Sequence, residues 1–533
     1  MTPASKVAGG RAKCFTREEV AKHSTSSSLY IIIDACIYDL TDFLHSHPGG
    51  SNILLSSSVA GKDSSQAFFS LHRAELLDDS RYSRLQVGVL DDEHSTIQRS
   101  ADGENSSVPY AEPAWLSSGN TFRSPYYTDC HRQFQRAMRK FAHEFLKPDA
   151  IAREADGQRP NRRVLEKMAE LNINCMRLGP GAHLRGRKLM DGLVNPEEFD
   201  YFHEMIIHQE ISRCGPGTRG YTDALLTGLV IGLSPILNFG SAELKRKVVP
   251  EVLEGKKFIC LAVTEAFAGS DVGGLRCRAM KSDDGKWWIV NGTKKWITNG
   301  TFADYFTVGC LTGPNSSRNF TVLLIPRTTG VKTRQIRTSY STTAGTAYVT
   351  FDNVRVPVQN TIGREGEGLF VILSNFNHER WSMACATGAT MRVAVEECLK
   401  YCTQHHVSGK PLISQPVIRG KLASMIANAE AYQTWLESLT YQMCHMSYKE
   451  QADKLAGPIA LLKMFGTKCA RQNARDATQM FGALAITDGG IGRIIENYRR
   501  TIPFDALLGG AEDVLADLGV RQVIRQMPPG TRL

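Results

Sequence analysis

The sequence lacks the short motifs that assign many chains to a functional class at once. None of its 13 cysteines forms a Cys-x-x-Cys pair, and no Gly-x-Gly-x-x-Gly or Walker loop follows an expected strand. The nearest glycine-rich run, 363–368, has the wrong spacing and precedes an expected helix. The cysteines are interpreted as mostly buried, reduced thiols, which is typical of an intracellular protein.

A strong charge of one sign is also missing. The chain carries 63 Lys and Arg against 54 Asp and Glu, which leaves a formal net charge of +9 spread thinly along it. No basic cluster alternates with aromatic residues, so nucleic acid is not an expected partner. The mild positive charge suits an anionic small molecule or an acidic protein partner.

Long apolar segments and a conventional targeting signal are absent as well. The first 11 residues contain no apolar core of a signal peptide, so we do not expect secretion. The longest apolar stretch, 225–237, is too short and too interrupted to span a bilayer, and it predicts a core helix. The final Thr531-Arg532-Leu533 loosely resembles a peroxisomal import tripeptide. We expect an intracellular protein, either cytoplasmic or peroxisomal.

What is present divides the chain by composition. With 533 residues, 42% apolar and 22% charged, it is long enough for two to four globular domains. Short strand-like and helical pieces come first, among them a strand at 29–34, and the polar stretch 91–119 then predicts a flexible linker. Helical periodicity follows, as in 126–146, then a β-rich block in which Asn291-Gly292 predicts a hairpin, then helices again.

The run His47-Pro48-Gly49-Gly50 requires a specific explanation. Pro48 stiffens the turn after a histidine, and two glycines let the backbone lie flat beside a large planar ring. A second histidine, His72, ends the apolar face of the helical segment that follows. Two histidines separated by an apolar lining could hold an iron from both sides.

YDLTDFLHSHPGG, followed by AGKDSSQAFFSLH, resembles the cytochrome b5 family. The resemblance implies that haem b is held between His47 and His72 as axial ligands, although the loop between them is a residue or two longer than usual. His45 lies outside the pattern and is expected at the surface. With both axial positions filled, the natural role of the iron is to carry single electrons.

Two segments of the β-rich block carry a second candidate site. LAVTEAFAGSDVGG, 261–274, ends an expected strand and turns through small residues whose backbone N–H groups could donate to a ring or a phosphate. KKWITNG, 294–300, sets an indole and a hydroxyl at the lip of an expected hairpin. Each segment taken alone is more often only a turn or a packing hairpin.

Together with FNHERW, DATQMFG and LGGAEDVLADLGVRQ, these segments resemble the acyl-CoA dehydrogenase family over about residues 120–525. The resemblance implies an FAD-dependent oxidoreductase that introduces an α,β double bond into an acyl-CoA or a related thioester. It also implies an α+β multidomain fold. The expected parts are a cytochrome b5-like haem-binding domain (11–90), a linker (91–119), an N-terminal helical domain (120–257), a middle β domain with the flavin site (258–364) and a C-terminal domain with a four-helix bundle (365–526).

The family's functional positions map onto this sequence residue by residue. Val263 and Thr264 would bond the flavin's pyrimidine edge, Trp296 would lie against the isoalloxazine, and Thr298 would donate to N5. Ser270 would touch the bound thioester beside the cofactor. In the family, one subunit also contacts the FAD of its neighbour. The matching positions here are Gln415, Gln479, Phe481 and Gly482, which implies a homodimer or homotetramer.

Removal of an α-proton beside a thioester needs a carboxylate in a dry pocket. Relatives place it at one of two chain positions, and the commoner one falls here on Gly509 and Gly510, which carry no carboxylate. The other falls on Glu379, directly before Arg380. The resemblance therefore implies Glu379 as the base and Arg380 in a supporting role near the substrate. Glu512 and Asp513 lie further along, where we expect the helix to turn them away.

The sequence departs from the family where relatives grip FAD across the dimer. An arginine and a phenylalanine are replaced by His405 and Ser408, and Ala483 stands where relatives have glycine. These changes predict a looser hold on FAD.

Two other interpretations stay open on the sequence. An oxygen-using oxidase or monooxygenase of the same superfamily would keep the fold and the acidic base. An electron-transfer or acyl-binding protein that has lost catalysis would also fit the altered FAD segment. The electron acceptor, whether a flavoprotein, the haem domain or oxygen, is equally open.

Overall fold

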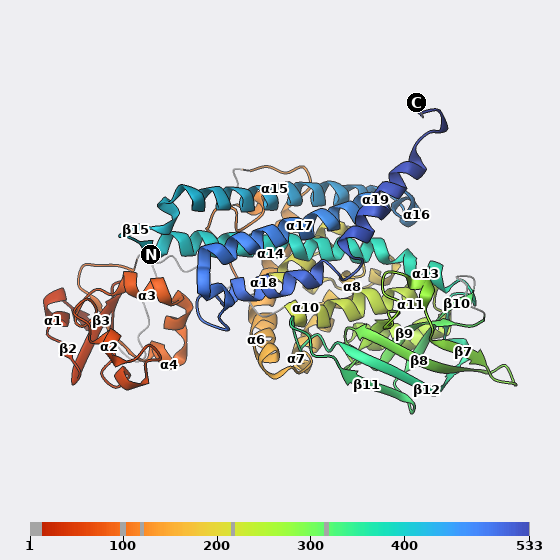
Figure 1. The fold of residues 1–533 in the computed structure, drawn as a ribbon, viewed down its shortest axis with the longest axis horizontal. Coiled ribbons are helices and arrows are strands. Elements are labelled where there is room, and N and C mark those ends of the chain that lie inside the picture. Colours follow the sequence, from red (N-terminus) through yellow and green to blue (C-terminus); the bar gives the residue numbers. More distant parts are fainter. Residues whose placement is uncertain (1–12, 96–102, 118–121, 215–218, 314–318, 532–533) are drawn as a thin grey trace. The chain divides into compact units, whose positions relative to one another are not determined.

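The computed structural model describes residues 13–95, 103–117, 122–214, 219–313 and 319–531 (Figure 1). The chain forms two compact units. The first contains the chain up to Ala101 together with Glu397–Lys421 and Met480–Arg493. The second contains Asp102–Glu396, Leu422–Gln479 and Ile494–Leu533.

The first unit is built on a five-stranded sheet in the order β1-β5-β4-β3-β2. Its strands are β1 (Lys13–Phe15), β2 (Ser24–Thr25), β3 (Ser28–Ile33), β4 (Cys36–Asp39) and β5 (Gln86–Leu90). The strand predicted at 29–34 is thus confirmed. Four short helices accompany the sheet, namely α1 (Arg17–Ala21), α2 (Ser51–Leu54), α3 (Ser65–Leu71) and α4 (Ser80–Ser83). One face of the sheet packs with α2 and α3 around Leu29, Ile31 and Leu44.

The second unit begins with helices that enclose a buried core. They are α5 (Asp129–Phe141), α6 (Lys147–Asp156), α7 (Arg162–Glu170), α8 (Ile173–Met176), α9 (Tyr201–Ser212), α10 (Arg219–Leu226), α11 (Ser234–Phe239) and α12 (Ala242–Leu253). The periodicity of 126–146 is confirmed because Phe134 and Met138 on α5 are fully buried. The continuous helix Arg219–Phe239 is long and apolar enough to cross a membrane, but 81% of its apolar window is buried within the protein. The expectation that this stretch is too short to span a bilayer is therefore wrong on length, because the helix extends beyond 225–237, whereas its burial agrees with the predicted core helix.

An eight-stranded sheet follows, in the order β11-β12-β8-β7-β9-β10-β13, with β6 beside β9. Its strands are β6 (Ile259–Ala262), β7 (Arg278–Lys281), β8 (Trp287–Ile297), β9 (Tyr305–Leu311), β10 (Phe320–Pro326), β11 (Val331–Gln335), β12 (Ala347–Pro357) and β13 (Thr361–Ile362). Apolar residues of β8, β9, β10 and β12, among them Trp288, Val308 and Val349, form its core.

The hairpin predicted at Asn291-Gly292 is wrong, because both residues lie inside the single strand β8. This strand pairs with β7 on one side and β12 on the other, so it does not reverse. Gly292 is needed for a different reason. A Cβ there would lie 2.7 Å from the Cα of Cys277, so the glycine permits a close approach of two backbones.

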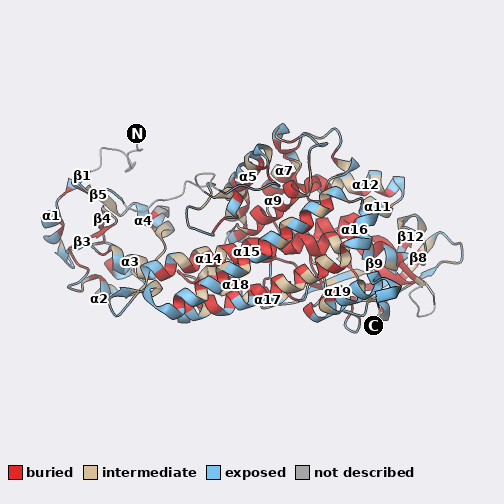
Figure 2. Ribbon diagram, turned by 90° about the horizontal axis from the view of Figure 1, so that it is seen from above, coloured by how far each residue is buried: buried red, intermediate tan, exposed pale blue. Residues whose placement is uncertain are grey.

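The C-terminal helices form a bundle of α14 (Phe376–Gln404), α15 (Pro416–His445), α17 (Ala456–Phe481) and α18 (Arg493–Asp505). Figure 2 shows these helices side by side, with their buried faces turned toward one another. Tyr432 of α15 donates to the carbonyl of Ala384 on α14, and Tyr498 of α18 donates to Ala470 on α17. Shorter helices, α13 (Gly368–Ser374), α16 (Tyr448–Lys454) and α19 (Glu512–Gln526), accompany the bundle.

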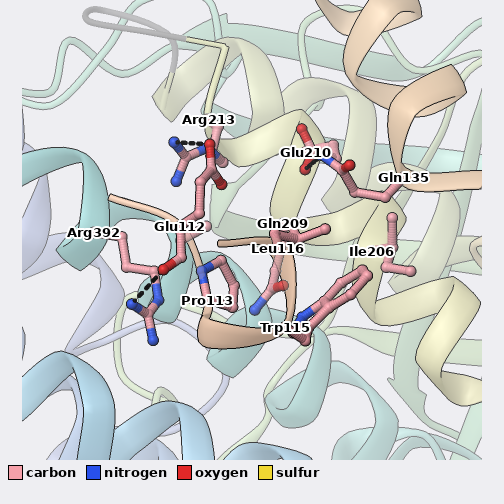
Figure 3. Close-up of a pocket in the computed structure, with 11 residues that line it drawn as sticks. Glu112, Pro113, Trp115, Leu116, Gln135, Ile206, Gln209, Glu210, Arg213 and Arg392 are labelled. Carbon is pink, nitrogen blue, oxygen red and sulfur yellow. Dashed lines mark hydrogen bonds and ion pairs between the residues drawn. The ribbon is translucent and has the colours of Figure 1, made fainter. Parts of the chain in front are cut away.

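Part of the stretch expected as a flexible linker is packed into the second unit. Glu112 and Trp115 are buried, and the Glu112 carboxylate accepts a hydrogen bond from Arg139 at 2.9 Å. It also accepts one from Arg213 at 3.2 Å (Figure 3). Trp115 stacks on Tyr127 with ring centroids 3.8 Å apart. Composition could not reveal this anchoring, because the arginines that bind Glu112 come from distant parts of the chain.

Candidate active site

The Glu379 side chain is buried in the first turn of α14, with 5% of its surface exposed. Its Oε2 atom makes no hydrogen bond with any residue that the structure describes. Gly509, in the loop between α18 and α19, lies directly against it, since a Cβ on Gly509 would be 3.3 Å from Glu379 Oε1. The two chain positions considered for the base therefore converge on one small volume, which the Glu379 carboxylate occupies.

The residues on either side of Glu379 point to other neighbours. Successive side chains on a helix are rotated by about 100°, and His378 accordingly donates to Glu204 of α9 at 2.7 Å. Arg380 donates from Nε to the carbonyl of Gly509 at 3.0 Å. Trp381 donates to Thr440 at 2.9 Å. These three contacts hold the helix around Glu379 and do not involve its carboxylate.

The environment adjusts the acidity of Glu379. Burial, the largest effect, raises its pKa to about 7, although the nearby charges of Arg380, Lys463 and His378 oppose the rise. A carboxyl group with a pKa near the working pH can both accept and release a proton, as a general base requires.

Glu512 and Asp513 do not share this pocket. Glu512 begins α19 and forms an ion pair with Arg471 at 3.2 Å, whereas Asp513 is exposed. The loop before them turns through Gly509 and Gly510, whose φ angles of +66° and +116° favour glycine. The expectation that the helix turns both acids away agrees with these positions.

The residues assigned to the flavin gather at the end of β6 and β8. The backbone N–H of Lys295 donates to the carbonyl of Thr264 at 2.9 Å, which places Thr264 beside Trp296. Val263 and Thr298 are buried, whereas the Trp296 indole is 52% exposed. A large, half-exposed indole beside two strand ends fits a planar ring that stacks on it.

A buried ion pair supports this edge. Lys294 is fully buried, and its Nζ donates to Glu265 at 2.7 Å and to the carbonyl of Val263 at 2.9 Å. Glu265 also accepts from the backbone N–H groups of Arg276 and Cys277, so the loop after β6 is fixed at its base. Ser270, which we expect at the thioester, lies exposed in that loop.

The residues assigned to a neighbour's FAD lie mostly in the first unit. There the rings of Tyr401 and Phe481 stack at 4.1 Å, and His405 stacks on Tyr401 at 4.9 Å. Gly482 follows with φ +59° and no atom within 4 Å of an added Cβ. Gln415 precedes α15, and Gln479 lies at the end of α17 in the second unit. Ser408, with φ +51°, lies in the turn between β14 (His406–Val407) and β15 (Lys410–Pro411).

The two histidines of the first unit are neighbours, with their ring planes at 79° to each other. The ring centroids of His47 and His72 are 6.1 Å apart, which leaves space for one metal atom bonded to both rings at roughly 2 Å. His47 donates from Nδ1 to the carbonyl of Gly50 at 3.3 Å, so its Nε2 is left for a ligand. Burial lowers the pKa of His72, with a smaller contribution from His47, and this favours the neutral, ligating form.

The glycines of this turn have separate roles. A Cβ on Gly49 would lie 2.7 Å from Cε1 of His47, so the imidazole needs glycine there. Gly50 has φ +81°, a conformation that favours glycine. His45 is exposed, as expected.

Comparisons with known proteins agree with this architecture. Residues 128–256, 260–354 and 366–524 match the family models described as acyl-CoA dehydrogenase N-terminal, middle and C-terminal domains. Residues 16–91 match the cytochrome b5-like heme/steroid binding domain. The expected fold class is thereby confirmed.

Individual relatives also carry acyl-CoA dehydrogenase names. The chain is 39% identical to acyl-CoA dehydrogenase apdG of Emericella nidulans, over 79% of this chain and 96% of that protein. It is 35% identical to acyl-CoA dehydrogenase AFT10-1 of Alternaria alternata, over 78% and 96%. A solved glutaryl-coenzyme A dehydrogenase has the same fold, with 22% identity, a TM-score of 0.65 and coverage of 76% and 98%.

The fold and these sites define a flavoprotein oxidoreductase with an appended small domain. The chain belongs to the acyl-CoA dehydrogenase family and carries an N-terminal cytochrome b5-like domain.

Sequence reasoning missed the residues that support the site. Lys463 of α17 and the pair of Glu204 with His378 are buried beside or behind the base. Lysine and glutamate in a helix usually lie at the solvent-exposed surface, so their sequence positions did not indicate burial. The one available signal was that Lys463 stands within an otherwise apolar run, IALLKMF.

Proposed function

We propose that this enzyme oxidises an acyl-CoA or a related thioester at the α,β bond, with Glu379 as the base. The observation that carries the proposal is the buried Glu379 carboxylate, which has one unpartnered oxygen and lies against Gly509. A carboxylate in such a position is available to a substrate C–H group instead of being committed to a hydrogen bond within the protein.

In this proposal Glu379 removes the α-proton of the substrate. The charge that develops on the thioester needs hydrogen-bond donors in a dry pocket. The β-hydrogen leaves with its electron pair, so the substrate loses two electrons and two hydrogens and becomes an enoyl thioester. FAD, when bound, supplies the acceptor for that hydride.

Residues at the end of β6 and β8 would hold the FAD. Val263 and Thr264 offer backbone groups at the strand end, Trp296 offers its ring face, and Thr298 offers a hydroxyl. Because Gln415, Phe481 and Gly482 would reach a neighbour's FAD, we also propose a homo-oligomer. Sedimentation of the FAD-loaded protein would test that assembly.

We further propose that the small domain binds haem b through His47 and His72. The 6.1 Å separation of their rings and the hydrogen bond that occupies Nδ1 of His47 support this assignment. Haem b, when bound, would carry single electrons away from the flavoprotein site.

The test of the base is anaerobic mixing of the FAD-loaded protein with butyryl-, isovaleryl- and octanoyl-CoA while flavin absorbance is followed. We expect Glu379→Gln to slow flavin bleaching by roughly 10²–10⁴-fold, because a general base contributes about that factor. The flavin spectrum should persist. Asp513→Asn, an exposed carboxylate nearby, should change nothing.

The same measurement separates the alternatives. Bleaching by a thioester without oxygen supports dehydrogenation, and the rate should rise as the pH passes about 7, where Glu379 ionises. An active Glu379→Gln variant would remove the assignment of the base. Stoichiometric peroxide in air would instead indicate an oxidase, and no bleaching with any thioester would favour a non-catalytic role.

A further inference from the structure

Lys463 lies in the first half of α17 with 1% of its surface exposed. Its Nζ donates to the carbonyl of Asp505 at 3.0 Å and to the carbonyl of Gly510 at 2.9 Å. These carbonyls stand at the two ends of the loop that joins α18 to α19. A buried ammonium is costly unless hydrogen-bonded, so the contact strongly restrains where the loop can lie.

Arg380 fastens the same loop from the other side. Its Nε donates to the carbonyl of Gly509 at 3.0 Å, next to the carbonyl that Lys463 binds. The loop is therefore held by two cations through its backbone. Its outer surface faces solvent, since Leu507 is 68% exposed.

The loop and Lys463 meet at the carboxylate of Glu379. A Cβ on Gly509 would lie 3.3 Å from Glu379 Oε1 and 3.7 Å from Lys463 Cε. The lysine is thus beside the carboxylate, yet its Nζ hydrogen bonds go to the two carbonyls. A buried cation near the carboxylate stabilises its ionised form without occupying the oxygen that must accept a proton.

We propose that Lys463 is a positioning residue for the reaction, which fastens the Gly509–Gly510 loop over Glu379 and keeps a buried cation beside the carboxylate. The inference rests on the proposed function, because it assumes that Glu379 is the base. It extends that function by assigning a task to a residue of a different helix.

A purely structural lysine would give a different result on mutation. If Lys463 only filled space and bonded carbonyls, its loss would lower activity equally at every pH. If its charge acts on Glu379, its loss would shift the pH dependence. The other charged groups near Glu379 are Arg380 and His378, and those near Lys463 also include Asp505 and Glu512. All of these stay unchanged in the test.

The experiment measures the anaerobic rate of flavin reduction from pH 5.5 to 9.5 in Lys463→Met, Lys463→Gln and Lys463→Arg, using the fastest thioester of the panel above. Met and Gln remove the charge. We therefore expect the acidic limb of the pH profile, where the rate rises as Glu379 ionises, to move to a pH about one unit higher. The rate at pH 6.5 should then fall about tenfold and recover at high pH. KM should change little, and Arg should keep the limb in place.

Lys463→Gln retains a donor for one carbonyl and serves if the Met variant folds poorly. An acidic limb in Lys463→Gln at the wild-type pH, with or without a uniform loss of rate, would overturn the inference. That result differs from failure of the proposed function, which would appear as normal flavin reduction in Glu379→Gln.

Discussion

At the scale of single residues, Gly509 shows how little room the loop before α19 leaves beside Glu379, the proposed base. An added methyl would lie 2.8 Å from Met383 Sδ and 3.3 Å from Glu379 Oε1, so both must shift. Misplacement of a catalytic group by an ångström or less can cost up to about 10²-fold in rate.

We therefore expect Gly509→Ala to slow anaerobic flavin reduction by about ten- to a hundredfold. The φ of +66° adds a stability cost of about 1 kcal/mol for a non-glycine residue. Gly285→Ala is the matched control, because Gly285 has φ +68° but no atom within 4 Å of an added Cβ. It should carry the strain without the loss of rate. Equal rates in the two variants would show that the methyl does not reach the base.

The buried position of Glu379 beside Gly509 agrees with the base proposed from sequence, but the groups around it could not be predicted. Glu379 was found because the Glu-Arg pair stands in a recognisable motif and Gly509 and Gly510 carry no carboxylate. Lys463 bonds carbonyls 42 and 47 residues away in the chain, and such contacts leave no periodic signal.

At the scale of elements, α9 and α14 are joined by a buried ion pair directly behind the base. Burial would lower the pKa of His378, but the Glu204 carboxylate outweighs it and raises that pKa above 6.5. Glu204 has its pKa lowered to about 2, because His378 and His208 outweigh its burial. Both partners of the pair are thus charged between about pH 4.5 and 6.5.

This pair predicts a pH-dependent stability. A histidine whose pKa is raised on folding stabilises the protein fully below its unfolded pKa, and that stability is lost as the pH rises through the folded value. Glu204→Gln should therefore cost about 3 kcal/mol near pH 6, as expected for a broken buried pair, and less near pH 9. Thermal unfolding of the FAD-loaded protein at both pH values would measure the difference.

The control for this prediction is a surface pair. Arg162 and Glu166 lie 2.7 Å apart with their side chains 89% and 59% exposed, so Glu166→Gln should change stability by less than about 1 kcal/mol at either pH. A cost for Glu204→Gln that is the same at pH 6 and pH 9 would contradict the assigned charge states.

Helices and strands were predicted well where one face is buried. They were predicted poorly where pairing with neighbouring strands determines the conformation. The helix at 126–146 follows from apolar spacing, because α5 buries one face. Asn291-Gly292 failed as a hairpin because β7 and β12 pair with β8 from both sides and keep it extended. Local turn propensity cannot register these two partners.

At the scale of the whole molecule, composition and motifs predicted the order of the domains. They did not predict how much of the expected linker, 91–119, is packed against a domain. Residues 103–117 contain Glu112 and Trp115, which look like ordinary linker residues until Arg139, Arg213 and Tyr127 are placed against them. The segment between the small domain and the dehydrogenase is therefore shorter than its polar composition suggests.

The proposed haem makes a prediction for the full chain. The protein loaded with FAD and haem should show a Soret band, and adding a thioester without oxygen should bleach the flavin and then shift the Soret band as the iron is reduced. The double variant His47→Ala/His72→Ala should lose the Soret band completely, because both imidazole ligands are removed, while flavin bleaching persists at the wild-type rate.

His45→Ala, which changes an exposed histidine two residues from His47, should keep both signals. A wild-type protein that takes up no haem would contradict the ligand assignment, and a haem that stays oxidised beside a reduced flavin would contradict the electron route while leaving the ligands in place.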